Sequence, residues 1–232
     1  MFDRIKKAIH KPEDGAAAPV ASAAPGAIAA WAVSQRLSYA AEPGSDGFGI
    51  GGDIDGHAWR LECTAPSREF IRGRELRARA DVDANAEAAI MVMNRPLKEA
   101  LETRAYSLYT DNLQTTMGTS LPEEMRWLAM FEEVGWSSAP DEFWRSYAVV
   151  ADLREHGQLW VTPEVVAALM DWPAGAAAQA QTPLILMLLR GKVYLRQEYS
   201  PAQLPTLAYA TGVLKAASAS ALRNLPAVDL PL

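Results

Sequence analysis

Residues 183–198 read PLILMLLRGKVYLRQE, a stretch that limits how the rest of the chain can fold. Two apolar runs flank Arg190-Gly191, and a two-residue turn between such runs is typical of a β-hairpin. If Leu189 pairs with Lys192, one face of this hairpin is purely apolar. That face holds Leu184, Leu186, Leu188, Val193 and Leu195. The other face holds Ile185, Met187, Tyr194 and Arg196. The hairpin therefore predicts a sheet with at least one well-buried face.

A second hairpin signal lies at residues 51–62, GGDIDGHAWRLE. This stretch fits the calcium-loop pattern D-x-[DN]-x-[DN]-G-x5-E except at Gly51, where the pattern requires Asp. A calcium loop of this type needs a helix on each side, whereas these flanks alternate like strands. A two-residue turn at Asp55-Gly56 would give an apolar face on which Gly52 leaves room for Trp59. We expect this hairpin, and calcium binding at residues 51–62 stays an alternative hypothesis.

Further strand and helix signals follow each other along the chain. Strands are predicted over residues 70–81, 89–93 and 143–151, and a loop over residues 174–182. Helices are predicted over residues 97–109, 123–135, 163–172 and 200–223. This order indicates an α+β fold, with a largely antiparallel sheet or sheets built from hairpins and helices packed on one side. The chain lacks the glycine-rich phosphate-binding patterns of nucleotide-binding α/β folds.

Composition divides the chain into four parts. Residues 1–11 form a short basic amphipathic segment, and residues 12–29 are an Ala/Pro/Gly-rich linker. Residues 30–225 form the globular domain, either as one unit or as two lobes, 30–135 and 136–225. Residues 226–232 are a tail. The N-terminal segment could contact a protein partner or an anionic membrane surface. Its candidate contact residues are Phe2, Ile5, Lys6, Lys7 and Ile9.

Charge and cysteine content exclude several classes of protein. The net charge is -6, and because residues 1–11 carry +3, the rest of the chain carries -9. Such an acidic body argues against nucleic-acid binding. The single cysteine, Cys63, excludes an intramolecular disulfide and a Cys-rich zinc site, which fits a reducing cytoplasm. We interpret Cys63 as a buried strand residue rather than a catalytic thiol. No apolar run reaches the ~18 residues that a membrane span needs.

One basic cluster is the main candidate binding site within the domain. It consists of Arg68, Arg72, Arg74, Arg77 and Arg79. On a strand, Arg77 and Arg79 share a face, so the cluster could bind an anionic ligand. The alternative is a solvated face on which these arginines pair with nearby carboxylates. Trp136 and Trp144 are candidate interface residues, with burial in the core as the alternative. The sequence predicts no catalytic residue, metal site or cofactor.

The spacing of apolar residues and turns in residues 143–172 and 182–199 resembles a bacterial family of uncharacterised proteins. The G-x-I-x-G-x-x-W pattern at residues 52–59 is similar to that family as well. Members of the family often carry transmembrane helices, but the resemblance implies no known activity. Our leading hypothesis is a non-catalytic cytoplasmic protein that binds other proteins as an adaptor or scaffold. Its N-terminal segment would contact a membrane surface or a partner. The alternative is an anion-binding module or enzyme that uses the basic cluster. The sequence does not predict the oligomeric state.

Overall fold

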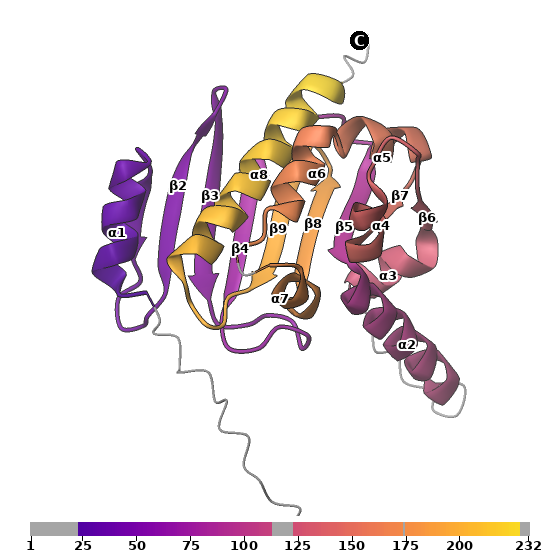
Figure 1. Ribbon diagram of the computed structural model, residues 1–232, viewed down its shortest axis with the longest axis horizontal. Helices are drawn as coiled ribbons and strands as arrows, with labels where there is room; N and C mark the ends of the chain where they lie inside the picture. The colour runs from indigo at the N-terminus through magenta and orange to yellow at the C-terminus, as the bar shows by residue number, and fades with distance from the viewer. Residues whose placement is uncertain (1–22, 113–122, 174, 228–232) are drawn as a thin grey trace, which may run out of the picture.

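The described part of the chain forms one antiparallel sheet with helices on both faces (Figure 1). A computed structural model describes residues 23–112, 123–173 and 175–227. Within them the strand order is β1-β2-β3-β4-β9-β8-β5-β7-β6, and all neighbours are antiparallel. The strands are β1 (Ser38–Ala41), β2 (Phe48–Ile54), β3 (His57–Thr64), β4 (Glu75–Asp81), β5 (Ala89–Asn94), β6 (Glu132–Val134), β7 (Tyr147–Ala151), β8 (Leu184–Leu189) and β9 (Lys192–Glu198). The helices are α1 (Pro25–Ser34), α2 (Arg95–Asn112), α3 (Glu123–Met130), α4 (Asp141–Ser146), α5 (Arg154–Trp160), α6 (Pro163–Met170), α7 (Ala176–Gln181) and α8 (Leu204–Asn224). The predicted α+β class with a largely antiparallel sheet is confirmed.

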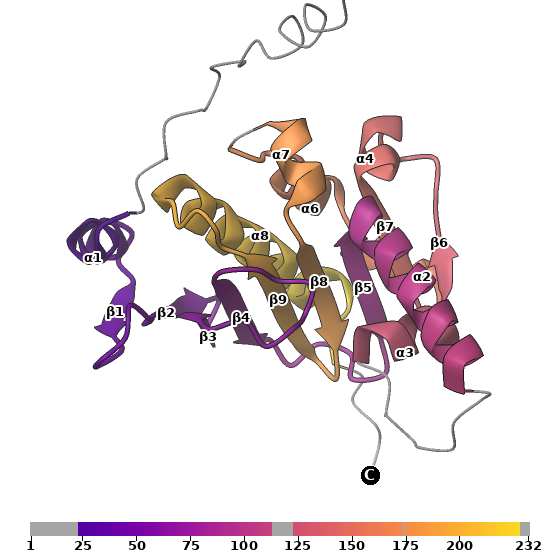
Figure 2. The same ribbon diagram turned by 90° about the horizontal axis from the view of Figure 1, so that it is seen from below.

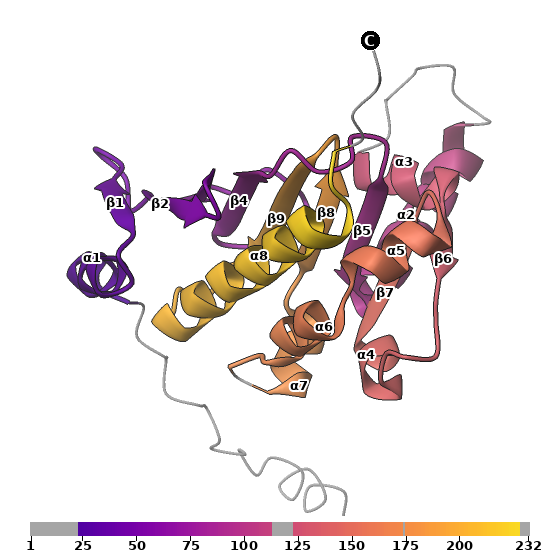
Figure 3. The same cartoon turned by 90° about the horizontal axis from the view of Figure 1, so that it is seen from above.

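The helices form one large layer and one small layer (Figures 2 and 3). Helices α1, α4, α5, α6 and α8 contribute to the main core on one face of the sheet. Helices α2 and α3 pack on the other face, where Leu97 and Trp127 meet Met91 and Met187 of β5 and β8. The prediction that helices pack on one side is therefore corrected for α2 and α3. Strand β5 is buried along its whole length because it has helices on both faces.

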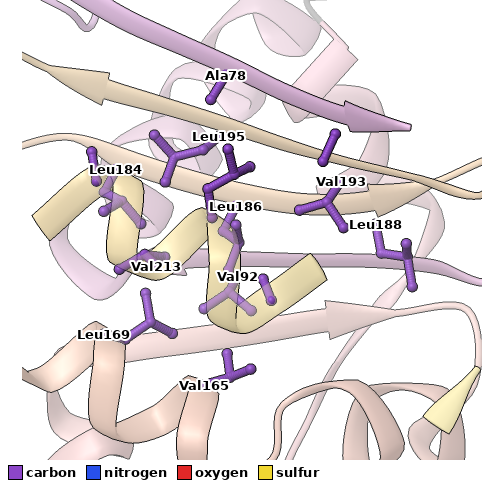
Figure 4. Packing of buried hydrophobic residues seen from close by; sticks show 14 of the residues in the cluster. Ala78, Val92, Val165, Leu169, Leu184, Leu186, Leu188, Val193, Leu195 and Val213 are labelled. Carbon is purple, nitrogen blue, oxygen red and sulfur yellow. The ribbon is translucent and has the colours of Figure 1, made fainter. Parts of the chain in front are cut away.

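The β8–β9 hairpin lies in the middle of the sheet with the predicted register. Leu189 pairs with Lys192, and both turn residues have positive φ, 51° at Arg190 and 71° at Gly191. Leu186 and Leu195 face each other in the main core and are at most 1% exposed. Figure 4 shows them packed among side chains of α6 and α8. The tight turn thus places the apolar face of both strands against the helices.

The β2–β3 hairpin also has the predicted register. Asp55 and Gly56 have φ of 51° and 86°, and Gly52 pairs with Trp59. The Oδ1 of Asp53 accepts a hydrogen bond from the N–H of Gly56 at 2.8 Å, which ties this carboxylate to the turn. Among the described residues no group of three or more metal-ligating side chains gathers. The calcium hypothesis lacks the helices that such a loop needs, because both flanks are strands.

Several elements differ from the sequence prediction. The sequence analysis does not predict β1 or α5, and β4 begins at Glu75 rather than at residue 70. Helix α1 begins at Pro25, inside the predicted linker 12–29, because proline suits a first helical turn and Ile28 and Ala32 then share a buried face. The predicted helix 123–135 ends at Met130, since residues 132–134 pair with β7 as strand β6. The first four residues of the predicted strand 143–151 belong instead to helix α4, which has two carboxylates in its first turn. The predicted loop 174–182 contains α7, held by the buried Gln179, which donates to the carbonyl of Leu169 at 2.7 Å.

The described chain does not divide into the lobes 30–135 and 136–225. Strand β4 from the first half pairs with β9 from the second, and β5 lies between β7 and β8. The sheet therefore interleaves the two halves of the sequence. Such long-range pairing makes the described residues one structural unit.

We predict that Gly52→Ala destabilises the fold while Gly49→Ala on the same strand does not. A Cβ at Gly52 would lie 2.8 Å from Leu37 Cδ2 and 3.1 Å from the Trp59 ring, whereas at Gly49 the nearest atom is 4.0 Å away. Overpacking of this kind costs about 1–3 kcal/mol in free energy of unfolding. Urea denaturation of both variants measures the difference. Equal stability of the two variants would contradict the proposed contact.

Candidate functional site

A basic face occupies the part of the sheet that α2 and α3 leave uncovered. We define it by the cationic side chains of β3, β4 and β9 that point away from the main core: Arg60, Arg77, Arg79, Lys192 and Arg196. Arg60 pairs across the strands with Arg79, and Arg77 with Arg196. Directly paired residues project from the same face of a sheet, so the four arginines form two adjacent rows. Lys192 lies opposite Asp81, next to these rows. Core residues such as Leu61 and Ala78 alternate with them and are buried.

Glu62 links two cations of the basic face. Its Oε1 lies 2.8 Å from Nη2 of Arg60, on the same strand, and its Oε2 lies 3.5 Å from Nη2 of Arg77 on β4. The Arg60 side chain is 72% exposed and that of Arg77 is 39% exposed. Exposed pairs of this type add little to stability. Their main effect is to hold the two guanidinium groups in place while leaving them open to solvent.

Asp81, at the C-terminal end of β4, also contacts two cations of the basic face. Its Oδ1 lies 2.7 Å from Nη2 of Arg79 and 3.1 Å from Nζ of Lys192. Partial burial alone would raise the pKa of Asp81, but hydrogen bonds from Arg79 and Lys192 outweigh it and lower the pKa. The hydrogen bond to Asp81 raises the pKa of Arg79. Both partners are therefore charged at neutral pH.

The border with α3 carries two buried carboxylates. Glu75 is fully buried, accepts a hydrogen bond from the N–H of Ser67 at 2.6 Å, and binds Nη1 of Arg196. Glu124 of α3 is 1% exposed and accepts a hydrogen bond from Nε of Arg68 at 2.8 Å. Nε of Arg196 lies 3.9 Å from the same Glu124 oxygen. Buried carboxylates need such partners, so this part of the face is structural as well as basic.

The outward side chains surround a shallow hollow of about 580 Å³. It is lined mainly by Arg60, Glu62, Arg77, Arg79, Tyr194 and Arg196. Because the hollow is partly open to solvent, its charges stay in contact with water. The arrangement suits contact with the surface of another molecule better than enclosure of a small substrate.

The structure brings together only part of the predicted arginine cluster. Arg77 and Arg79 belong to the basic face, and Arg68 lies at its border beside Glu124. The Arg74 side chain lies outside the basic face. Its Nη1 donates a hydrogen bond to the carbonyl of Asp46 at 2.6 Å and contacts Cys63 Sγ at 3.5 Å. Arg72 lies exposed in the loop before β4. The prediction of one five-arginine site is therefore corrected to a face that includes two of its members.

Sequence reasoning missed Arg60, Lys192 and Arg196 as members of the face. The alternation of Arg77 and Arg79 with small apolar residues did indicate a solvent-facing side of β4. The missing information was the pairing of β4 with β9, which joins residues more than a hundred positions apart. Both hairpins were predicted, but no local pattern shows which strand lies beside which.

Cys63 is confirmed as a core residue. It is fully buried on β3, opposite Leu76 of β4. Burial raises the pKa of its thiol, and the hydrogen bond from Arg74 only partly offsets this effect. A thiol in this state is a poor nucleophile.

Trp136 and Trp144 come together as an aromatic pair beside the main core. Their ring centroids are 5.0 Å apart at 88°, and Phe143 packs against Trp144 at 4.9 Å. Trp136 is 7% exposed, and Trp144 is partly buried. A largely apolar hollow of about 370 Å³ lies next to Trp136 between α4 and α6. Burial explains both residues, and their role in an interface stays a prediction.

The N-terminal candidates Phe2, Ile5, Lys6, Lys7 and Ile9 lie outside the described residues. Membrane or partner contact through this segment therefore stays a prediction. Within the ranges that the structure describes, no helix combines the length and apolar character needed to cross a membrane.

We predict that Arg196→Met costs far more stability than Arg60→Met. Loss of Arg196 removes a cationic partner of the fully buried Glu75, and an unpaired buried carboxylate costs about 3 kcal/mol or more. Loss of Arg60 breaks an exposed pair that is worth about 1 kcal/mol or less. Chemical denaturation at pH 7 compares the two. Similar losses would show that Glu75 does not depend on Arg196.

The lowered pKa of Asp81 predicts a pH-dependent effect of Asp81→Asn. A carboxyl whose pKa is lower in the folded chain stabilises it fully above the ordinary value of 3.8, and this contribution disappears as pH falls through the lowered pKa. The difference in free energy of unfolding between the parent chain and the variant should therefore be constant near neutrality and shrink below about pH 4. Urea titrations from pH 7 to pH 2 measure it. A difference that stays unchanged at low pH would contradict the ion pairs.

Comparisons with known proteins returned no match. No family model matches the chain, and no curated protein or solved structure is similar to it. The resemblance to an uncharacterised bacterial family consequently stays a prediction.

Proposed function

We propose that this chain is a non-catalytic binding protein that holds an acidic segment of a protein partner on its basic face. The observation that carries the proposal is the distribution of charge. In a chain of net charge -6, the outward side chains of β3, β4 and β9 carry five cations against the four carboxylates of Glu62, Glu75, Asp81 and Glu198, a local balance of +1. Neighbouring carboxylates hold them in fixed positions, so that a partner would meet a preorganised surface.

An extended acidic segment fits this surface better than a small anion. The cations lie in rows across three strands, and strands are spaced about 4.8 Å apart, so the charges are spread rather than converging on one point. Each guanidinium already faces a carboxylate, for example Arg79 with Asp81. A single phosphate would compete with one such pair, whereas a segment with several carboxylates can engage several cations at once. Tyr194 in the middle of the face offers a partly apolar contact.

The open shape of the basic face supports binding over catalysis. Enzyme sites strengthen electrostatic interactions by excluding water from the reacting groups. A hollow that is partly open to solvent provides less of this exclusion than an enclosed site. Location in a cytoplasm belongs to the same proposal, supported by the buried free thiol of Cys63. The acidic character of the rest of the chain disfavours a nucleic-acid partner.

We predict that a fluorescent 20-residue poly-glutamate peptide binds the full chain and that salt weakens its affinity. The double variant Arg60→Gln, Arg79→Gln should bind about tenfold more weakly, because two adjacent cations of the face are lost. Fluorescence anisotropy at 50 and 300 mM salt measures both effects. The matched control is Arg145→Gln, Arg154→Gln, which removes two exposed cations from α4 and α5 on the opposite face.

Two results would overturn the proposal. Equal affinity of the two double variants would mean that the basic face does not carry the binding. If inorganic pyrophosphate displaces the peptide at stoichiometric concentration and raises the melting temperature of the parent chain but not of Arg60→Gln, Arg79→Gln, the face is a small-anion site instead.

A further inference from the structure

The two edges of the sheet differ in how they are protected against pairing with another strand. An exposed edge strand presents unpaired N–H and C=O groups, and charges on the edge prevent unwanted association. Strand β6 forms one edge; it has only three residues, two of which are Glu132 and Glu133. Glu133 also lies 2.9 Å from Nη2 of Arg95. This edge is short and charged.

Strand β1 forms the opposite edge, and among the residues that the structure describes it has neither charged side chains nor a further strand beside it. Its four residues, Ser38–Ala41, read SYAA and carry no charge. The N–H of Glu42, directly after the strand, donates to the carbonyl of Gly47 on the β2 side. Main-chain groups of successive strand residues point in alternate directions, so Ser38 and Ala40 face β2 as well. Tyr39 and Ala41 consequently direct their N–H and C=O groups to the open edge.

Helix α1 lies over this edge and presents a second uncharged surface (Figures 2 and 3). Pro25–Ser34 contains no charged residue. Ile28 and Ala32 face the core, whereas Ala27, Ala30 and Val33 point outward, and Val33 is 72% exposed. A molecule that covers this end of the sheet must therefore match an open strand and an adjoining apolar helix face together.

We propose that a second copy of this chain covers the edge, with β1 paired antiparallel to its own counterpart about a two-fold axis. This chain supplies both required surfaces, an open strand and a small apolar helix face, and a two-fold axis perpendicular to the sheet brings like surfaces together. A lone extended peptide would satisfy β1 and leave α1 exposed. In the dimer the sheet runs through both copies, the α1 helices meet on one side, and the two basic faces lie on the other.

The geometry of the edge also selects a register. Side chains alternate between the two faces of a strand, so residues paired across the two-fold axis share a face only if both numbers are odd or both are even. Pairing Tyr39 with the partner subunit's Ala41, and the reverse, uses all four outward main-chain groups of these two residues. Centring the pair on Tyr39 instead would place Ala41 opposite the partner subunit's Leu37, whose N–H is already bonded to the carbonyl of Ala32. The favoured register therefore puts Ala40 opposite the partner subunit's Ala40.

Cysteine cross-linking tests this register directly on the full chain. Opposed Ala40 residues form a non-hydrogen-bonded pair with a Cα separation of about 4.5 Å, within the range of a disulfide. The natural Cys63 is buried and does not compete. Under mild oxidation at 10 μM, Ala40→Cys should form a covalent dimer at least tenfold faster than the matched control Glu132→Cys on the β6 edge. Equal rates for the two variants would overturn the proposal.

Sedimentation velocity without any cross-link provides the second measurement. The full chain should sediment as a dimer as its concentration rises from 1 to 100 μM. Ala30→Lys places a charge on the outward face of α1 and should weaken dimerisation at least tenfold. The same change at the exposed Ala129 of α3 should leave it unaltered. A chain that stays monomeric at 100 μM overturns the proposal. Ala30→Lys lies away from the basic face and should not change poly-glutamate affinity, so the two proposals can fail separately.

Discussion

Two tight turns fix the positions of most strands in this protein. At Asp55-Gly56 and Arg190-Gly191 both residues have positive φ, a geometry that matches the twist of paired strands and allows one register. A shift by one residue would move every side chain of a strand to the opposite face. Strand β4 pairs with β3 of one hairpin and β9 of the other, so the register of each turn extends across the sheet. The separation of apolar core from basic face depends on these turns.

The outer side of the sheet is divided between two kinds of surface. Over β5 and β8 it is apolar, and α2 and α3 cover it with side chains such as Leu101 and Trp127. Over β3, β4 and β9 it is charged, and covering it with helices would remove many ions from water at a large cost in free energy. Cations there are held by carboxylates, two of which are buried at the border with α3. The same residues that complete the sheet thus leave a basic surface open to a partner.

Local signals in the sequence predicted the local parts of this structure well. The two hairpins, strand β5 and helix α6 follow from apolar periodicity, turn residues and helix-start residues such as Thr162 and Pro163. The sequence does not predict β6, because this strand depends on pairing with β7. It does not predict α7 either, because bonds to distant residues hold that helix, from Gln179 to the carbonyl of Leu169 and from Asn94 to the carbonyl of Ala180. The alternation around Arg77 and Arg79 predicted the part of the basic face that lies on β4. The remaining cations lie on β3 and β9, and their position beside β4 depends on strand pairing that no local pattern shows.

Lysine footprinting with the full chain tests most directly whether the basic face is the binding surface. The chain would be acetylated briefly with and without saturating poly-glutamate peptide, and modification would be quantified at each lysine by mass spectrometry. Lys192 lies on the basic face, whereas Lys215 lies on α8, with its Nζ 5.6 Å from the centre of the Trp59 ring on the helix side of the sheet. The account predicts that the peptide protects Lys192 and leaves Lys215 unchanged. Protection of Lys215 alone, or of neither lysine at saturation, would contradict it.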